Sequence, residues 1–168
     1  MICNSPEHKE KFERGNMRGL LTVLGRIFVS VIFIASGVNK LLDWKSTENG
    51  VSKILSDWAQ RAGDIDFLQT FFLQISPYVD ILVLIALSFE LIGGVMVLLG
   101  FHVKLGALLL FLFMIPTTIL FHSFWYYEDP AQKIQLVMFL KNIAIMGGLL
   151  YMMAFGSGSK ENKFDSKK

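Results

Sequence analysis

Four long apolar stretches alternate with polar segments along the chain. Each has close to the roughly 20 residues that a helix needs to cross the hydrocarbon core of a bilayer. Successive residues inside them are apolar, as at positions 81–87, whereas the strands of a membrane barrel alternate between apolar and polar. The pattern therefore predicts an all-α integral membrane protein, a four-helix bundle with spans at residues 20–42, 81–100, 103–121 and 134–155.

The connection between the first two spans, residues 43–78, is the one long enough to hold structure of its own. Helical spacing gives its first half an apolar face, and a second apolar group follows. Both are too short to span, so we predict amphipathic helices at the membrane interface, which either cover the outer mouth of the bundle or only anchor it in lipid. The two apolar groups are Val51, Ile54, Leu55, Trp58 and Ala62, and then Phe67, Leu68, Phe71, Phe72 and Ile75.

The two ends of the chain are polar. Residues 1–19 form a charged segment, and residues 156–168, rich in Gly, Ser and Lys, are expected to be a disordered tail. With the N-terminus inside, nine basic residues fall on the cytoplasmic side and four on the outer side. Because cytoplasmic loops carry the excess of Lys and Arg, both termini are expected in the cytoplasm, which makes both end segments cytoplasmic tails around one membrane domain at residues 20–155.

Composition agrees with a membrane protein and narrows its chemistry. The hydrophobic share is 53%, the charged share 18% and the mean hydropathy +0.50. A net charge of +2 provides no basic surface for nucleic acid, so no nucleic-acid partner is expected. One cysteine, Cys3, excludes an internal disulfide or a cluster of thiolates within one chain, and no metal site is expected. The usual nucleotide-binding and hydrolase motifs do not occur, so we expect no cofactor to be held by this chain alone.

Ionisable residues inside the spans are the informative positions. A charged side chain at the centre of a span costs at least about 2.5–3.5 kcal/mol, so such groups should face one another. Glu90 lies about 13 Å and Lys141 about 10 Å from the predicted outer ends of their spans, which favours a Glu90–Lys141 pair. Arg26, about 9 Å from the inner face, either reaches toward Glu90 or extends to the cytoplasmic surface.

If Arg26 joins this group, two cations share one carboxylate. The surplus positive charge would then favour an anion or a strong acceptor, such as a quinone carbonyl, a sulfur oxyanion or a lipid phosphate. Three neighbouring residues add hydrogen-bond donors: Asn39, Lys40 and Asn142. His122, at the outer interface, is either a proton donor or simply solvated. The alternatives for the whole group are a structural polar core and a proton path.

Several segments in this order resemble the DoxX family. They are the stretch from Arg26 to Leu41, the run from Phe89 to Gly94 with Gly100 after it, His122 through Trp125, and Lys141-Asn142 leading to Gly147-Gly148. The resemblance covers all four spans, and the segment at residues 43–78 is longer than the minimal family pattern.

The resemblance implies a four-helix protein of the bacterial inner membrane. DoxX relatives are associated with membrane oxidoreductase assemblies, including a subunit of thiosulfate:quinone oxidoreductase, and with detoxification complexes in which the DoxX-like protein anchors soluble redox partners. It points to seven residues as the set to test: Arg26, Asn39, Lys40, Glu90, His122, Lys141 and Asn142.

Three function classes follow from these observations. The first is a subunit of a redox-linked assembly, an oxidoreductase subunit not expected to be catalytic alone, which binds a quinone or small anion while soluble or membrane partner proteins carry the electrons. The second is a small transporter or lipid-binding protein, and the third is a membrane scaffold without a ligand. Contact with the lipid bilayer is common to all three, and each is compatible with a homo-oligomer.

Overall fold

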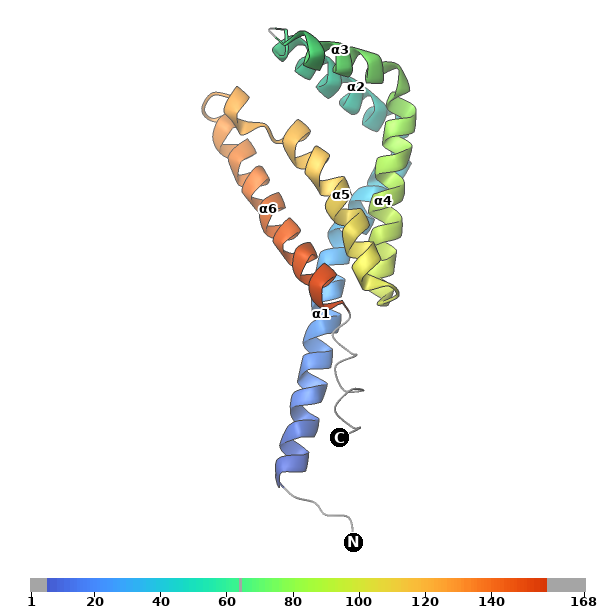
Figure 1. Ribbon diagram of the computed structural model, residues 1–168, viewed down its shortest axis with the longest axis vertical. Coiled ribbons are helices and arrows are strands. Elements are labelled where there is room, and N and C mark those ends of the chain that lie inside the picture. The colour runs from blue at the N-terminus through green and yellow to red at the C-terminus, as the bar shows by residue number, and fades with distance from the viewer. Residues whose placement is uncertain (1–5, 64, 157–168) are drawn as a thin grey trace.

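The computed structural model describes residues 6–63 and 65–156, and within them it is built from helices (Figure 1). No strand occurs in these residues. The elements in chain order are α1 (Pro6–Leu42), α2 (Trp44–Arg61), α3 (Asp66–Ile75), the 3-10 turn η1 (Ser76–Tyr78), α4 (Val79–Leu99), α5 (Val103–Phe121), the 3-10 turn η2 (Phe124–Tyr126) and α6 (Ala131–Phe155).

Four segments are long and apolar enough to cross a membrane: Met17–Leu42, Asp66–Leu99, Val103–Tyr126 and Ala131–Phe155. They contain the predicted spans except for residue 100 at the end of the second, and the third predicted span coincides with α5. The predicted fold class, a membrane bundle of four helices with amphipathic helices in the first connection, is therefore confirmed.

The ends of the chain differ from the simple division into tails and spans. α1 begins at Pro6, so the described part of the predicted tail at residues 1–19 continues the first helix. Residues 1–5 lie outside the described residues. The same holds for the predicted tail at 156–168 except for Gly156, which ends α6 with a positive φ of 65°.

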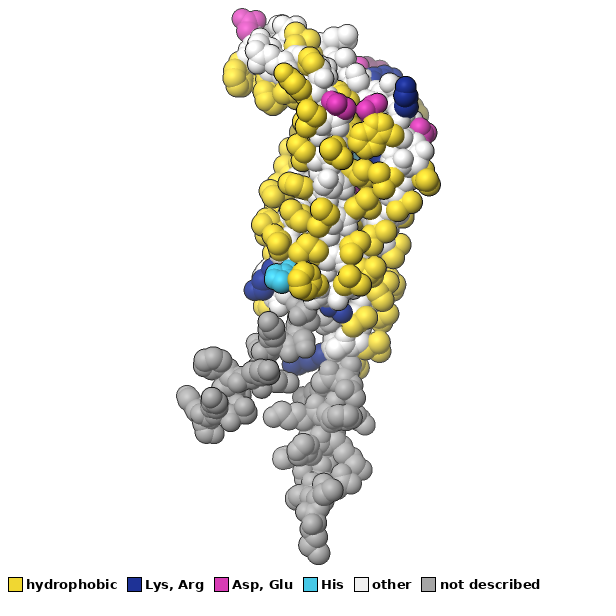
Figure 2. Space-filling model, turned by 90° about the vertical axis from the view of Figure 1, so that its right-hand side faces the viewer, with side chains coloured by type: hydrophobic (Ala, Val, Ile, Leu, Met, Phe, Trp, Pro, Cys, Tyr) yellow, Lys and Arg dark blue, Asp and Glu magenta, His cyan; other side chains and the backbone are white. Residues whose placement is uncertain are grey.

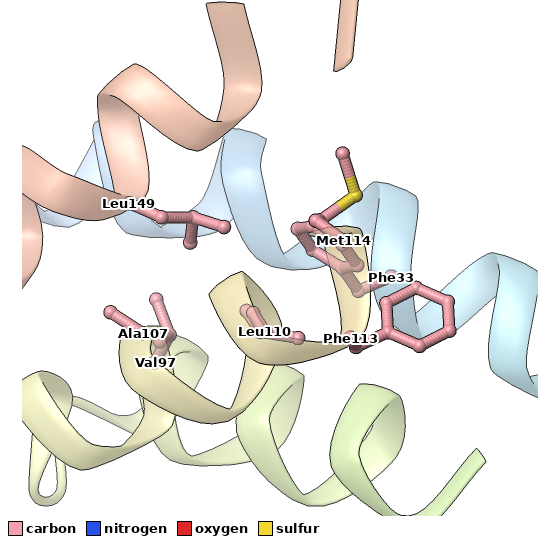
Figure 3. Packing of buried hydrophobic residues seen from close by; sticks show 7 residues of the cluster. All are labelled: Phe33, Val97, Ala107, Leu110, Phe113, Met114 and Leu149. Atoms are coloured by element: carbon pink, nitrogen blue, oxygen red, sulfur yellow. The ribbon is translucent and has the colours of Figure 1, made fainter. Parts of the chain in front are cut away.

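The four long helices pack in the order α1, α4, α5, α6, each mainly against the next. One buried cluster contains side chains from all four helices (Figure 3). Close packing of these apolar side chains against one another stabilises the bundle. Phe33 of α1 and Phe113 of α5 meet edge to face, with their ring centroids 6.4 Å apart. The cluster consists of Phe33, Val97, Ala107, Leu110, Phe113, Met114 and Leu149.

Helices α2 and α3 cover one end of the bundle, and we call them the cap and that end the capped end (Figure 1). The opposite end, where α4 turns into α5 and α6 finishes, is called the terminal end. Leu55 and Ala59 of α2 and Phe72 of α3 are buried in one cluster with the beginning of α4. Figure 2 shows one face of the molecule, on which hydrophobic side chains cover the sides of the bundle and charged ones lie at its two ends.

The cap contacts the last turn of α5 and the turn η2 that follows it. The indole Nε1 of Trp58 donates a hydrogen bond to the carbonyl oxygen of Leu120, 3.1 Å away. The guanidinium of Arg61 lies 4.6 Å from the ring centroid of Tyr126, within the range of a cation–π contact. The predicted amphipathic helices therefore cover the mouth of the bundle, which was one of the two roles expected of them.

Candidate functional site

A lysine and a glutamate meet in the interior of the bundle. Lys40 of α1 donates from Nζ to Oε2 of Glu90 on α4, at 2.5 Å, and to Oγ of Ser36 one turn back on α1, at 2.8 Å. Glu90 is eleven residues after Val79, so it lies about 16 Å along α4 from the capped end and close to the middle of that helix. An ion pair at this depth satisfies two charges that lipid would exclude.

The two partners of this pair are buried to different degrees. Only 2% of the Glu90 side chain is exposed, whereas 31% of the Lys40 side chain is exposed. The ammonium of Lys40 also lies over the ring of Phe113, 5.1 Å from its centroid. The carboxylate is therefore enclosed by protein, while the ammonium borders an aromatic face and stays partly open to the surroundings.

Small residues bring α1 and α4 close enough for this contact. A Cβ atom on Gly37 would come within 2.8 Å of Cγ of Leu91, and one on Gly94 would come within 3.1 Å of Cγ1 of Ile34. Larger side chains at these two positions would separate the helices, as expected for small residues at helix interfaces in membranes. The two glycines thus set the register in which Lys40 lies opposite Glu90.

Arg26 does not join the pair. It precedes Lys40 by fourteen residues on α1, which corresponds to about 21 Å along the helix. Its guanidinium packs against Gly100, where α4 ends in the left-handed conformation with φ of 76°. A cation at this place interacts favourably with the carbonyl end of α4. Of the two predicted alternatives, the reach toward Glu90 is wrong.

Lys141 does not pair with Glu90 either, so this prediction is also wrong. The side chain of Lys141 is exposed, and its Nζ has Sδ of Met138, 3.5 Å away, as its hydrogen-bond partner among the described residues. The neighbouring Asn142 points the other way, into the bundle. Successive residues of a helix are 100° apart, so adjacent positions face different surroundings even at the same depth.

Polar contacts join α5 to α6 at three levels, and at the terminal end Nζ of Lys104 donates to the carbonyl oxygen of Ala154 at 3.0 Å. Asn142 donates from Nδ2 to Oγ1 of Thr118 at 3.2 Å, and both residues are buried. Nearer the capped end, Nδ1 of His122 lies 2.9 Å from Oε1 of Gln135 and donates to this oxygen in the tautomer that carries its proton on Nδ1. These contacts all join α5 to α6, so Asn142 and His122 belong to a helix interface that is separate from the Lys40–Glu90 pair.

Of the seven predicted site residues, the structure brings together Lys40 and Glu90. Asn39 is exposed on α1 beside the pair and does not take part in it. Sequence reasoning missed Ser36 and Phe113, which contact Lys40, and the role of Thr118 as the partner of Asn142 in the separate α5–α6 interface. A signal for the first contact exists in the sequence, because small, polar or charged residues recur on the packed face of α1, at Arg26, Ser30, Gly37 and Lys40, with the apolar Phe33 between them.

The chemistry of the pair is that of a hydrogen-bond donor with a fixed counter-charge. The Lys40 ammonium carries three N–H groups, of which Glu90 and Ser36 take two. One N–H remains for a further acceptor. Among the residues that the structure describes, no three His, Cys, Asp or Glu side chains gather as metal ligands.

Comparison with known proteins adds a family and two relatives. The family model described as DoxX matches residues 21–123. The chain is similar to the inner membrane protein YphA of Escherichia coli (strain K12), with 23% identity over 88% of this chain and 91% of that protein. It is also similar to the inner membrane protein YqjF of the same organism, with 27% identity over 82% of this chain and 85% of that protein. No solved structure matches the chain.

Proposed function

Because the chain belongs to the DoxX family, we propose that it is a membrane-integral subunit of a redox-linked assembly and that Lys40 and Glu90 bind the carbonyl head of a quinone. We place it in the bacterial inner membrane, since both relatives are named inner membrane proteins and four segments are apolar enough to span. The excess of basic residues on the terminal side supports an orientation with that end in the cytoplasm.

The observation that carries this proposal is the unused N–H of Lys40. A quinone carbonyl is a neutral acceptor, and the ammonium is held in place by Glu90 and Ser36 so that little side-chain freedom remains to be lost on binding. The ring of Phe113, with its centroid 5.1 Å from the ammonium, makes the surroundings of this donor apolar. These residues offer a quinone a hydrogen-bond donor and a counter-charge.

A neutral acceptor suits this pair better than an anion. Arg26 and Lys141 lie elsewhere, so the expected surplus of positive charge around Glu90 does not arise. The carboxylate already balances Lys40, and an anion would have to approach Glu90 at close range in a medium of low dielectric. The quinone is therefore the member of the predicted ligand classes that we retain.

The residues of the chain suggest which role each component of this assembly has. A bound quinone would carry electrons and protons through the bilayer. Lys40 and Glu90 hold and orient its carbonyl, and partner proteins, soluble or membrane-bound, supply the electrons. We expect the purified chain alone to carry no stoichiometric haem or flavin and to show little turnover.

Binding of decylubiquinone to the full chain in lipid nanodiscs tests the proposal, with quenching of tryptophan fluorescence as the readout. Loss of a hydrogen bond to a charged group removes about 1.5–3 kcal/mol, so Lys40→Met should weaken binding by about tenfold or more. Ser88→Ala is the matched control. Ser88 lies on the same helix as Glu90, and its hydroxyl donates to the carbonyl oxygen of Leu84 instead of contacting the pair.

The double variant Lys40→Met with Glu90→Met separates binding from folding. Replacing both charges by apolar side chains of similar size leaves no unpaired charge in the core, so the bundle should stay folded. The proposal predicts that this folded variant fails to bind decylubiquinone. If it binds the quinone as tightly as the unmodified chain, the pair is a structural contact only and the proposal is wrong.

A further inference from the structure

Lys141 is a cation on the outside of a membrane helix. It follows Ala131, the first residue of α6, by ten residues, which places it about 15 Å along the helix from the capped end. Fourteen residues, or about 21 Å, separate it from Phe155 at the other end. Its side chain is exposed, and the thioether of Met138, a weak acceptor, is its partner within the described residues.

This position is too deep for the ammonium to reach the membrane surface. The aromatic residues Trp125 and Tyr126 lie at the beginning of α6 and mark the interfacial level at the capped end. An extended lysine side chain covers about 6 Å, so it falls short of that level by several ångströms. A lone cation facing lipid here costs at least about 2.5–3.5 kcal/mol, which a lipid phosphate at the surface does not offset.

The helix face around Lys141 is shaped for close contact with another helix. Ala144 and Gly148 lie three and seven residues after Lys141 and share its face of α6. A Cβ atom added at Gly147 or Gly148 would meet nothing within 4 Å. Only 11% of the residues in the most apolar part of α6 are buried, compared with 39% for the span that contains α5. The bundle therefore leaves most of α6 uncovered. Small residues of this kind let two membrane helices approach closely.

Charge decides what covers this face. A second copy of the chain packed symmetrically through α6 would bring two Lys141 side chains toward the same axis, where they repel each other. Within its described spans a copy has Glu90, which is enclosed with Lys40. Its other carboxylates there, Asp66 and Asp80, lie in the first turns of α3 and α4, at the capped end and not at the depth of Lys141. A carboxylate on a different membrane helix satisfies both the charge and the depth.

We propose that the face of α6 formed by Lys141, Ala144 and Gly148 docks a transmembrane helix of another protein, which carries an Asp or Glu side chain opposite Lys141. The inference rests on the proposed function only in that the chain works within an assembly, because this face and the Lys40–Glu90 pair are different sites. Binding of quinone and docking of the partner are therefore tested separately.

Zero-length cross-linking in membranes of the native cells tests the docking. Dicyclohexylcarbodiimide partitions into lipid and joins an amine directly to a carboxylate that is in contact with it. We expect an adduct in which mass spectrometry finds Lys141 linked to an Asp or Glu in a membrane span of another protein. Lys141→Met should abolish the adduct, whereas Lys133→Met, which removes a surface lysine paired with Asp129, should leave it unchanged.

Two further variants make the result specific. Lys141→Glu should prevent copurification of the partner, and exchange of the partner's cross-linked carboxylate for Lys should restore it. Gly148→Leu should also reduce copurification, because it fills the contact face without changing charge. The internal Lys40–Glu90 adduct reports that the reagent has entered the bundle.

The proposal is overturned by either of two outcomes. One is an internal Lys40–Glu90 adduct without any adduct at Lys141, which would mean that Lys141 faces lipid. The other is an adduct between two copies of this chain, which would make the face a self-association surface. Neither outcome changes what is expected for decylubiquinone.

Discussion

Two lysines lie inside the membrane spans and have opposite surroundings. Lys40 lies between α1 and α4, with a carboxylate at 2.5 Å and a hydroxyl at 2.8 Å. Lys141 lies on the uncovered side of α6 with a thioether at 3.5 Å. Glu90 and Lys141 are about 16 Å and 15 Å from the capped ends of their helices, yet they do not meet. Depth alone therefore does not decide which charges pair.

The two lysines differ because their side chains lie on different faces of their helices, one packed against the bundle and the other uncovered. Lys40 follows Gly37, whose small size lets α4 approach, and it occupies the packed face of α1. Lys141 is adjacent to Asn142, which already takes the inward direction on α6 through Thr118. One lysine is thus a partner within the chain, and the other is available to a partner outside it.

Lys40→Met should have the largest effect on stability. It leaves the enclosed Glu90 carboxylate without a counter-charge, and breaking a buried pair on one side costs about 3–5 kcal/mol. Unfolding of the purified chain in mixed micelles, followed by tryptophan fluorescence, measures this loss. Adding Glu90→Met to the variant should recover most of it; a double variant as unstable as the single one would contradict the role given to the pair.

Gly100→Ala should have the second largest effect. Gly100 has a φ of 76°, which costs a residue with a side chain about 1–2 kcal/mol, and a Cβ there would clash with the Arg26 guanidinium. The same unfolding measurement should show a loss of at least this size. Arg26→Ala added to Gly100→Ala should relieve the clash and leave the backbone cost. If Gly100→Ala were as stable as the unmodified chain, this would contradict the contact between the Arg26 guanidinium and Gly100 at the end of α4.

Thr118→Val should cost about 1 kcal/mol. The substitution keeps the shape of the side chain and removes the acceptor for Asn142, and hydrogen bonds between membrane helices contribute on this scale. The double variant Thr118→Val with Asn142→Leu should regain part of the loss, because no buried amide is then left unpaired. Additive losses in this double-mutant cycle would show that the two side chains do not interact.

Lys141→Met should have the smallest effect, within about 0.5 kcal/mol, on the isolated chain. The exposed ammonium makes no ionic contact within the described residues, so removing it breaks little. The comparison with Lys40→Met is the sharpest test of the difference between the two lysines. A loss of several kcal/mol for Lys141→Met would mean that Lys141 has a partner within its own chain.

The membrane spans could be predicted because hydropathy is a local property. The third predicted span coincides with α5, and the second differs from α4 by two residues at its start and one at its end. α1 extends back to Pro6 because a charged helix can continue into water, where hydropathy gives no signal. The two amphipathic helices followed from a spacing that repeats within a few turns.

The polar contacts were harder to predict because they depend on how helices face one another. Depth along a helix follows from counting residues, which puts Glu90 and Lys141 at similar distances from the capped ends of their own helices. α1, however, ends at Leu42 beside the middle of α4, and this brings Lys40 to the level of Glu90. The glycines that set this register are visible in the sequence, but which helix they face is decided by the packing of the whole bundle.

The length of α1 has a mechanical consequence. With 37 residues in one uninterrupted helix it is about 55 Å long, well beyond the 30 Å of hydrocarbon it has to cross, and it projects past the other helices in Figure 1. A stiff rod transmits rotation and displacement along its axis. A protein that binds the projecting part of α1 and rotates or shifts it would therefore also move Lys40. Binding in the aqueous phase could in this way displace a charge inside the bilayer.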